Sequence, residues 1–188
     1  FNSALLLAQD GSVVESYDKI HRVPLGEYVP FSKWLPWLVR WIGMGRDLTP
    51  GSEYTLFNLG EGVQAGVNIC FEDAFPEISR QFVLRGASVL MTLTNAAWYA
   101  ESAGSRQHLL HAVFRAAENR RPLLRSGNNS DTCLILPDGR VSGLLYDEPT
   151  GNRFVRGAKV YDLPTYRDPP VTLYARWGDW FSRLAAGL

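Results

Sequence analysis

The sequence predicts an α/β fold built on a mixed β-sheet, and three observations support this prediction. Apolar strand-like runs alternate with helical patterns over residues 54–136, which is typical of helices that cover a sheet. Turn signals such as Asp10-Gly11 join neighbouring runs as hairpins, so some of the strands must be antiparallel. The chain has 188 residues, of which 46% are hydrophobic, and this is enough for one domain with a full core.

The predicted elements follow in order along the chain. Helical spacing of apolar residues predicts helices over residues 76–85 and 105–119, which Gly86 and Pro122 end. Apolar runs and alternating segments predict strands at residues 3–9, 12–19, 54–58, 64–70, 87–93, 123–126, 132–136, 140–146 and 154–163.

Residues 20–51 form a long segment without a regular pattern. A loop of this length inside a compact domain is usually functional, and its aromatic content argues against disorder. Its part at residues 31–50 contains Trp34, Trp37 and Trp41 with basic residues between them. Such a combination is typical of a membrane–water interface, so we expect these three side chains to face a membrane. The alternative is a loop that packs on its own domain.

Charge and cysteine content narrow the possible functions. Lys and Arg together number 19, as do Asp and Glu, so the net charge gives no indication of nucleic-acid binding. Two cysteines cannot form a disulfide framework, and we expect Cys133 to be a small core residue. His108 and His111 share a helix face, but a third metal ligand is not evident, so a solvated face is favoured over a metal site. We expect no metal and no cofactor.

Cys70 is the first candidate for chemistry. It ends the apolar run of residues 66–70, and Glu72 follows two positions later. We interpret this run as a buried strand that carries the thiol to its carboxyl end, where α/β proteins bind ligands. A nucleophilic thiol needs a cation or a base nearby. Lys19, at the end of another predicted strand, is the favoured partner, and a Cys–His pair with His21 is the alternative.

Several motifs, in the expected order, resemble the nitrilase (carbon–nitrogen hydrolase) superfamily. Residues 17–31 resemble its lysine segment, and residues 66–72 resemble its cysteine segment. The fit is closest to one branch, the apolipoprotein N-acyltransferases of the bacterial inner membrane. The further blocks that resemble this branch are residues 95–99, 107–108, 115–116, 121–129 and 172–180. The resemblance therefore covers nearly the whole chain.

This resemblance implies a partial nitrilase-like αββα sandwich with a mixed sheet. Residues 1–165 would form the partial catalytic domain, and residues 166–188 would lead into a truncated transmembrane helix. We expect the chain to be a fragment whose N-terminal portion is missing, because it begins at Phe1 without Met and ends inside an apolar run. The family's general-base glutamate would lie upstream of Phe1, so we expect the fragment alone to be inactive or nearly so.

The resemblance also implies a site. Cys70 would be the nucleophile, Lys19 would stabilise the tetrahedral intermediate, and Glu27 would hold Lys19 and the substrate amine in place. Oxyanion or substrate-positioning roles would fall to the backbone N–H of Phe71 and to the side chains of Glu72, Trp98 and Asn2.

The implied reaction is acyl transfer. A phospholipid would donate a fatty acyl group to Cys70 as a thioester, and the N-terminal amine of a diacylglyceryl-cysteine apolipoprotein would accept it. The protein would act as a monomer on the periplasmic side of the bacterial inner membrane, without nucleic acid. Two alternatives stay open: a soluble nitrilase-type amidase that hydrolyses a small amide, and a catalytically dead nitrilase-like domain used for binding.

Overall fold

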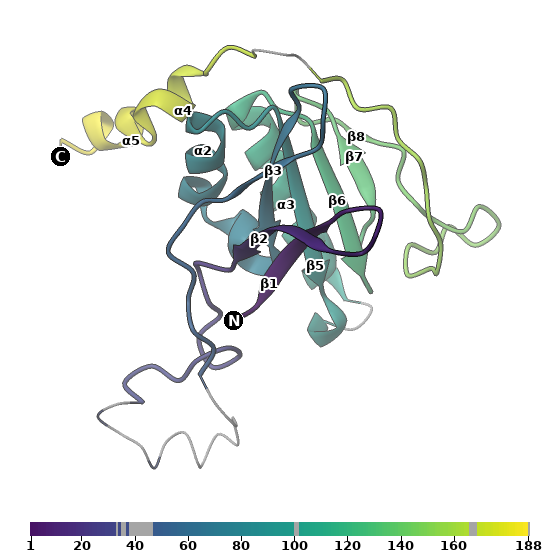
Figure 1. Cartoon of the computed structure of the whole chain (residues 1–188), viewed down its shortest axis with the longest axis horizontal. Helices are drawn as coiled ribbons and strands as arrows, with labels where there is room; N and C mark the ends of the chain where they lie inside the picture. The colour runs from purple at the N-terminus through teal and green to yellow at the C-terminus, as the bar shows by residue number, and fades with distance from the viewer. Residues whose placement is uncertain (33, 35–36, 38–46, 100–101, 166–168, 188) are drawn as a thin grey trace. The chain divides into compact units, whose positions relative to one another are not determined.

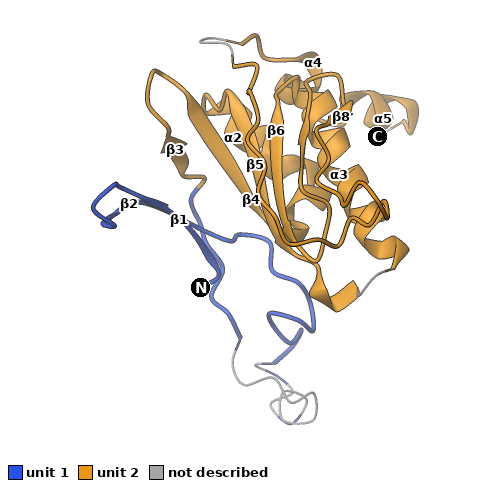
Figure 2. Ribbon diagram, turned by 90° about the vertical axis from the view of Figure 1, so that its right-hand side faces the viewer, with its two compact units in different colours: residues 1–53 blue, residues 54–188 orange. Residues whose placement is uncertain are grey.

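The structure, a computed structural model, describes residues 1–32, 34, 37, 47–99, 102–165 and 169–187. The chain divides into two compact units, residues 1–53 (unit 1) and residues 54–188 (unit 2). Figure 2 distinguishes the two units by colour. Each unit is described by itself.

Unit 1 begins with the predicted hairpin. Strand β1 (Ser3–Leu7) pairs antiparallel with β2 (Val13–Asp18), and Ser3 lies opposite Asp18. Gly11 in the turn has a φ of 84°, a conformation that glycine adopts without the steric cost of a Cβ atom. The chain leaves β2 at Lys19, whose backbone N–H donates to the carbonyl of Asn2 at 2.8 Å. The hairpin thus fixes the position of Lys19.

Unit 2 contains a six-stranded mixed sheet, drawn in Figure 1, in the order β3-β4-β5-β6-β7-β8. Strands β4, β5 and β6 are parallel to one another, and the remaining pairs are antiparallel, which confirms the predicted mixed sheet. The strands are β3 (Leu56–Asn58), β4 (Gln64–Ile69), β5 (Val89–Asn95), β6 (Leu123–Asn128), β7 (Cys133–Ile135) and β8 (Val141–Ser142).

Two helices cover this sheet and pack against each other. Helix α2 (Pro76–Leu84) contacts β4, and α3 (Ala103–Asn119) contacts β6 and β7. Their buried side chains recur at three- and four-residue spacing, as the sequence predicts, and lie with those of β5 in the core. The core side chains of these elements are Ile78, Phe82, Val83, Val89, Leu90, Leu109, Ala112 and Ala116.

The C-terminal segment is tied to the end of α3. It forms two short helices, α4 (Leu173–Trp177) and α5 (Trp180–Ala185). Thr172 caps α4: its hydroxyl accepts from the N–H of Ala175 and donates to the carbonyl of Glu118 at 2.7 Å. Among the described residues, none of the helices combines the length and the apolar character that a bilayer crossing requires.

Two predicted strands differ from the structure. The strand predicted at residues 140–146 shortens to β8, and the strand predicted at residues 154–163 is wrong, because those residues form no regular element. The side chains of residues 154–163 are partly or fully exposed throughout, and that of Val160 is 94% exposed. Neither face of the segment is therefore buried. Because burial of one face normally fixes the register of a strand, its absence here explains why no strand forms.

Candidate active site

Cys70 is the first residue of η1 (Cys70–Ala74), a short 3-10 helix that follows β4 directly. Its φ of 54° lies in the left-handed region, which is rare and costly for a residue with a Cβ atom. A nucleophile held in a strained turn between a strand and a helix has its reactive atom presented at the sheet edge. The Cys70 side chain is accordingly partly exposed rather than buried.

The sulfur of Cys70 lies beside the end of the neighbouring parallel strand β5. The hydroxyl of Thr94 donates to Sγ at 3.5 Å, and the thiol faces the carbonyl of Asn95 at 3.9 Å. The structure therefore places Cys70 at the carboxyl edge of the parallel strands, where the sequence predicts it. These two contacts fix the position of Sγ beside the end of β5.

Cys133 provides the contrast within the same unit. It lies in β7 and is fully buried, which confirms that it is a core residue. Burial raises the pKa of its thiol to about 11. Cys133 is therefore an inert thiol, and it can serve as an internal reference for Cys70.

Two buried carboxylates follow Cys70 in η1. The Glu72 carboxylate accepts from the backbone N–H of Ile69 at 2.8 Å and so closes the turn that carries the cysteine. The Asp73 carboxylate accepts from Arg125 Nη1 at 2.7 Å and contacts His108 Nε2 at 2.9 Å. Glu72, Asp73 and Arg125 have no solvent exposure. A charged side chain this deeply buried needs a partner, because an unpaired buried charge is strongly unfavourable.

Asp73, His108 and Arg125 form a buried cluster that the sequence pattern did not predict. The predicted solvated helix face for His108 is wrong, because this side chain is only 3% exposed and points at η1. The signal was a charged residue, Arg125, directly after the apolar pair Leu123-Leu124 in strand β6, since an arginine in such a position needs a buried partner. In the described part of the chain, His, Cys, Asp and Glu form no group of three suited to a metal ion.

Unit 1 brings together three of the predicted site residues. Lys19 Nζ lies 2.8 Å from Glu27 Oε2 and 2.9 Å from Oε1, and the Lys19 side chain is 1% exposed. The amide of Asn2 donates to Glu27 Oε1 at 2.8 Å, and the N–H of Val23 donates to Oε2 at 2.8 Å. Glu27 thus fixes the ammonium of Lys19, and each of the two Glu27 carboxylate oxygens also accepts a second hydrogen bond.

The surroundings of Glu27 lower the pKa of its carboxyl. Partial burial alone would raise this pKa, but the hydrogen bonds from Lys19, Val23 and Asn2 and the charge of Lys19 outweigh it. A lowered pKa means that the pair stabilises the fold above the ordinary value of 4.5 and loses this contribution as the pH falls through the lowered value.

This gives a prediction for acid unfolding. The Glu27→Gln variant should be less stable than the wild type at neutral pH, and the difference should shrink as the pH falls through the lowered pKa of Glu27, because protonated Glu27 and Gln are both uncharged. Urea unfolding of both proteins across this range measures the difference. A stability difference that does not change with pH would contradict an ionised Glu27 in the folded protein.

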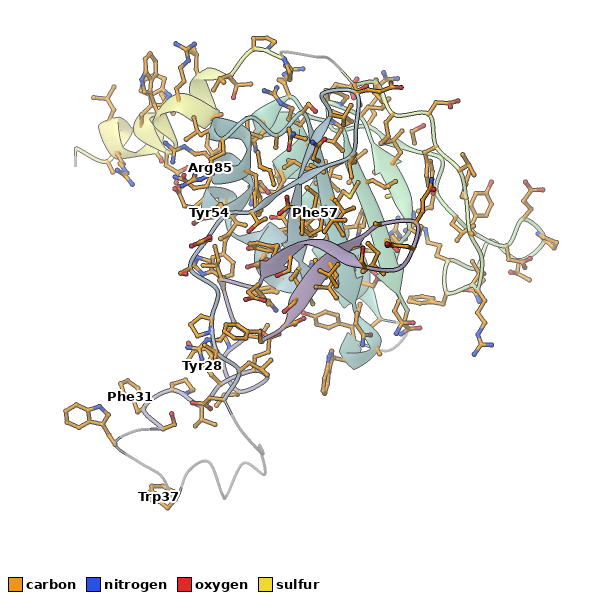
Figure 3. All side chains as sticks on the ribbon, viewed as in Figure 1. Tyr28, Phe31, Trp37, Tyr54, Phe57 and Arg85 are labelled. Carbon is orange, nitrogen blue, oxygen red and sulfur yellow. The ribbon has the colours of Figure 1, made fainter. Side chains whose placement is uncertain are left out.

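The predicted tryptophans lie at exposed positions or outside the described part, and Phe71 is half-buried. Trp98, in the short helix η2 (Ala97–Tyr99) that follows β5, is 87% exposed. Trp34 and Trp37 are 84% and 63% exposed, and Figure 3 shows the ring of Trp37 projecting away from the chain trace. Trp41 lies outside the described residues. Since Lys19 belongs to unit 1 and Cys70 to unit 2, their partnership stays a prediction.

Comparison with known families decides the classification. The model of the carbon–nitrogen hydrolase family matches residues 1–152. The chain belongs to the carbon–nitrogen hydrolase family. Two solved structures from the nitrilase superfamily share the fold of this chain. One, from Saccharomyces cerevisiae and a member of branch 10, has a TM-score of 0.55 and 18% identity over 77% of this chain and 49% of that chain. The other, an amidase from Nesterenkonia sp., has a TM-score of 0.54 and 23% identity over 76% and 50%.

Curated relatives of the chain confirm the resemblance to the apolipoprotein N-acyltransferases. The chain is 38% identical over 183 residues to an apolipoprotein N-acyltransferase of Geobacter metallireducens, covering 96% of this chain and 33% of that protein. It is 38% identical to apolipoprotein N-acyltransferase 1 of Treponema pallidum, covering 95% and 32%, and 33% identical to the apolipoprotein N-acyltransferase of Synechocystis sp., covering 95% and 33%. The chain spans about a third of the length of these relatives.

Proposed function

We propose that this chain carries catalytic residues of an apolipoprotein N-acyltransferase. The observation that carries the proposal is the 38% identity to such an enzyme across 96% of the chain. The structure supports it with a partly exposed thiol in a left-handed turn at the carboxyl edge of the sheet. The substrates would be a phospholipid, which donates the acyl group, and an apolipoprotein, which accepts it.

In the first step, the thiolate of Cys70 attacks the ester carbonyl of the phospholipid. The tetrahedral intermediate collapses with cleavage of the ester C–O bond, and the departing lysophospholipid oxygen takes up a proton. The acyl group stays on Sγ as a thioester. We assign the stabilisation of the oxyanion to the ammonium of Lys19 and the N–H of Phe71. Phe71 lies at the start of η1, where backbone N–H groups have no partner within the helix.

In the second step, the free α-amine of the diacylglyceryl-cysteine attacks the thioester carbonyl. The C–S bond breaks, the amine loses a proton, and Cys70 leaves as a thiolate ready for another cycle. A thioester suits this sequence because it is slow to react with water but reacts with amines. Ping-pong kinetics follow, and Glu27 would position both Lys19 and the incoming amine. We assign supporting roles to Asn2, Glu72 and Trp98.

We further propose that residues 31–50 contact the bacterial inner membrane on its periplasmic side. The high exposure of Phe31, Trp34 and Trp37 supports this, because bulky aromatic side chains in water are otherwise unfavourable. In Figure 3 the rings of Phe31 and Trp37 point outward from the trace. A membrane site also fits a phospholipid donor. We include in this proposal a transmembrane helix that continues from α5.

The product of the reaction tests the proposal. The full-length protein, incubated with vesicles of a phospholipid whose acyl chain is isotopically labelled, should transfer the label to the N-terminal amine of a diacylglyceryl-cysteine peptide. Peptide mass spectrometry measures this transfer, and an N-acetylated peptide is the matched control because its amine is blocked. Hydrolysis of small amides without any N-acylation would contradict the proposal and favour the amidase.

A further inference from the structure

Helix α3 presents two hydrogen-bond donors to the backbone of η1. His108 Nε2 lies 3.2 Å from the carbonyl oxygen of Cys70, and Arg115 Nη1 donates to the carbonyl of Asp73 at 3.0 Å. The two donors are seven residues apart, which places them on the same helix face. The two contacts therefore join α3 to the short helix that begins at Cys70.

The hydrogen on the His108 ring can be assigned from its surroundings. Nε2 faces two acceptors, the Cys70 carbonyl at 3.2 Å and the Asp73 carboxylate at 2.9 Å, so Nε2 carries a hydrogen. The other ring nitrogen, Nδ1, is buried and has no hydrogen-bond partner in the described part of the chain. A hydrogen on Nδ1 would therefore be buried without an acceptor. The contacts therefore place a hydrogen on Nε2, where it faces both acceptors.

The Asp73–Arg125 ion pair holds this ring in place. The second oxygen of Asp73 accepts from Arg125 Nη1 at 2.7 Å, and neither side chain has any solvent exposure. Arg125 Nη2 extends the network to the hydroxyl of Ser130 at 3.4 Å, and Ser130 contacts Ser105 at 3.1 Å. The ring of His108 is thus oriented by a carboxylate that is itself anchored to the sheet through β6.

We infer that His108 is a positioning residue that holds Cys70 in its left-handed conformation through the hydrogen bond to the Cys70 carbonyl. A residue with a Cβ atom keeps such a conformation only when its surroundings impose it. The conformation brings Sγ within reach of the Thr94 hydroxyl. The inference takes Cys70 as the nucleophile from the proposed function, but it concerns only the geometry of the thiol.

The test is the alkylation of Cys70 by iodoacetamide in the intact full-length protein, followed by peptide mass spectrometry. His108→Leu should slow alkylation about tenfold, since roughly one net hydrogen bond that holds the reactive geometry is lost. Cys133, which is fully buried, should stay unreactive and so report that the protein is folded. His111→Leu, one helical turn away, is the matched control and should leave the rate unchanged.

Two polar variants separate a hydrogen bond from simple packing. His108→Gln places an amide N–H close to the position of Nε2 and should restore most of the alkylation rate, whereas the shorter His108→Asn should not. If the leucine variant does not fold, this pair of variants decides the matter. Wild-type alkylation in a folded His108→Leu or His108→Asn protein would overturn the inference, as would equal rates in the Gln and Asn variants.

Lipid is not needed for alkylation, so this result stands apart from the proposed function. Slow alkylation in His108→Leu together with no acyl transfer in the wild type would leave His108 as a positioning residue and would reject only the acyltransferase. Acyl transfer in the wild type together with unchanged alkylation in His108→Leu would reject only the role of His108.

Discussion

Replacing Lys19 by alanine should slow the acylation of Cys70 by about 100- to 1000-fold, the usual effect of removing one oxyanion donor. The Lys19 side chain is 1% exposed and its ammonium is held by both oxygens of Glu27, so the ammonium is already ordered before a substrate arrives. Such a donor needs little reorganisation when charge develops on the substrate oxygen. The measurement is a single-turnover rate of Cys70 acylation by phospholipid vesicles in the full-length protein.

The structure of unit 1 should survive this change. Glu27 keeps its hydrogen bonds from Asn2 and from the N–H of Val23, and a thermal melt checks that the variant is folded. Lys159→Ala, which removes an exposed lysine, is the matched control and should acylate at the wild-type rate. A folded Lys19→Ala protein with an unchanged rate would remove Lys19 from the mechanism.

Replacing Arg125 by methionine should lower the free energy of unfolding by about 3–5 kcal/mol. The Asp73 carboxylate would then be buried without its ion-pair partner, which lies 2.7 Å away and is fully buried in the native protein. Urea unfolding of the wild type and the variant measures the loss. The double variant Asp73→Leu/Arg125→Met should recover most of the stability, because the uncompensated charge is then absent.

An exposed ion pair provides the control for this prediction. Arg140 lies 2.6 Å from Asp138, but its side chain is 76% exposed. Arg140→Met should therefore change the stability little, because solvent screens such a pair. Equal effects of the Arg125 and Arg140 substitutions would show that burial does not determine the energy of the Asp73–Arg125 pair.

The elements that the sequence predicted well are those with strong local signals. The hairpin has Asp10-Gly11 at its turn, and the two long helices have regular apolar spacing with clear stops. Cys70 at the carboxyl end of β4 follows from one apolar run. In each case the turn signal, helical spacing or apolar run lies within a few neighbouring residues, so the sequence alone predicts the element.

The predictions that failed needed contacts between distant residues. His108 and Arg125 lie 35 and 52 positions from Asp73, and local periodicity contains no information about such pairs. The strand predicted at residues 154–163 failed for a related reason, since an apolar run becomes a strand only where a partner and a buried face exist. The resemblance to a known family pointed to three site residues, Lys19, Glu27 and Asn2. Their mutual contacts in unit 1 are consistent with that grouping.

The mass of the Cys70 peptide after incubation with phospholipid tests the account most directly. In the full-length protein, that peptide should gain the mass of one fatty acyl chain, lose it on treatment with hydroxylamine, and show no gain when Cys70 is replaced by alanine. An unmodified Cys70 peptide from a folded protein that nevertheless hydrolyses a small amide would contradict the central claim that this thiol carries an acyl group from a lipid.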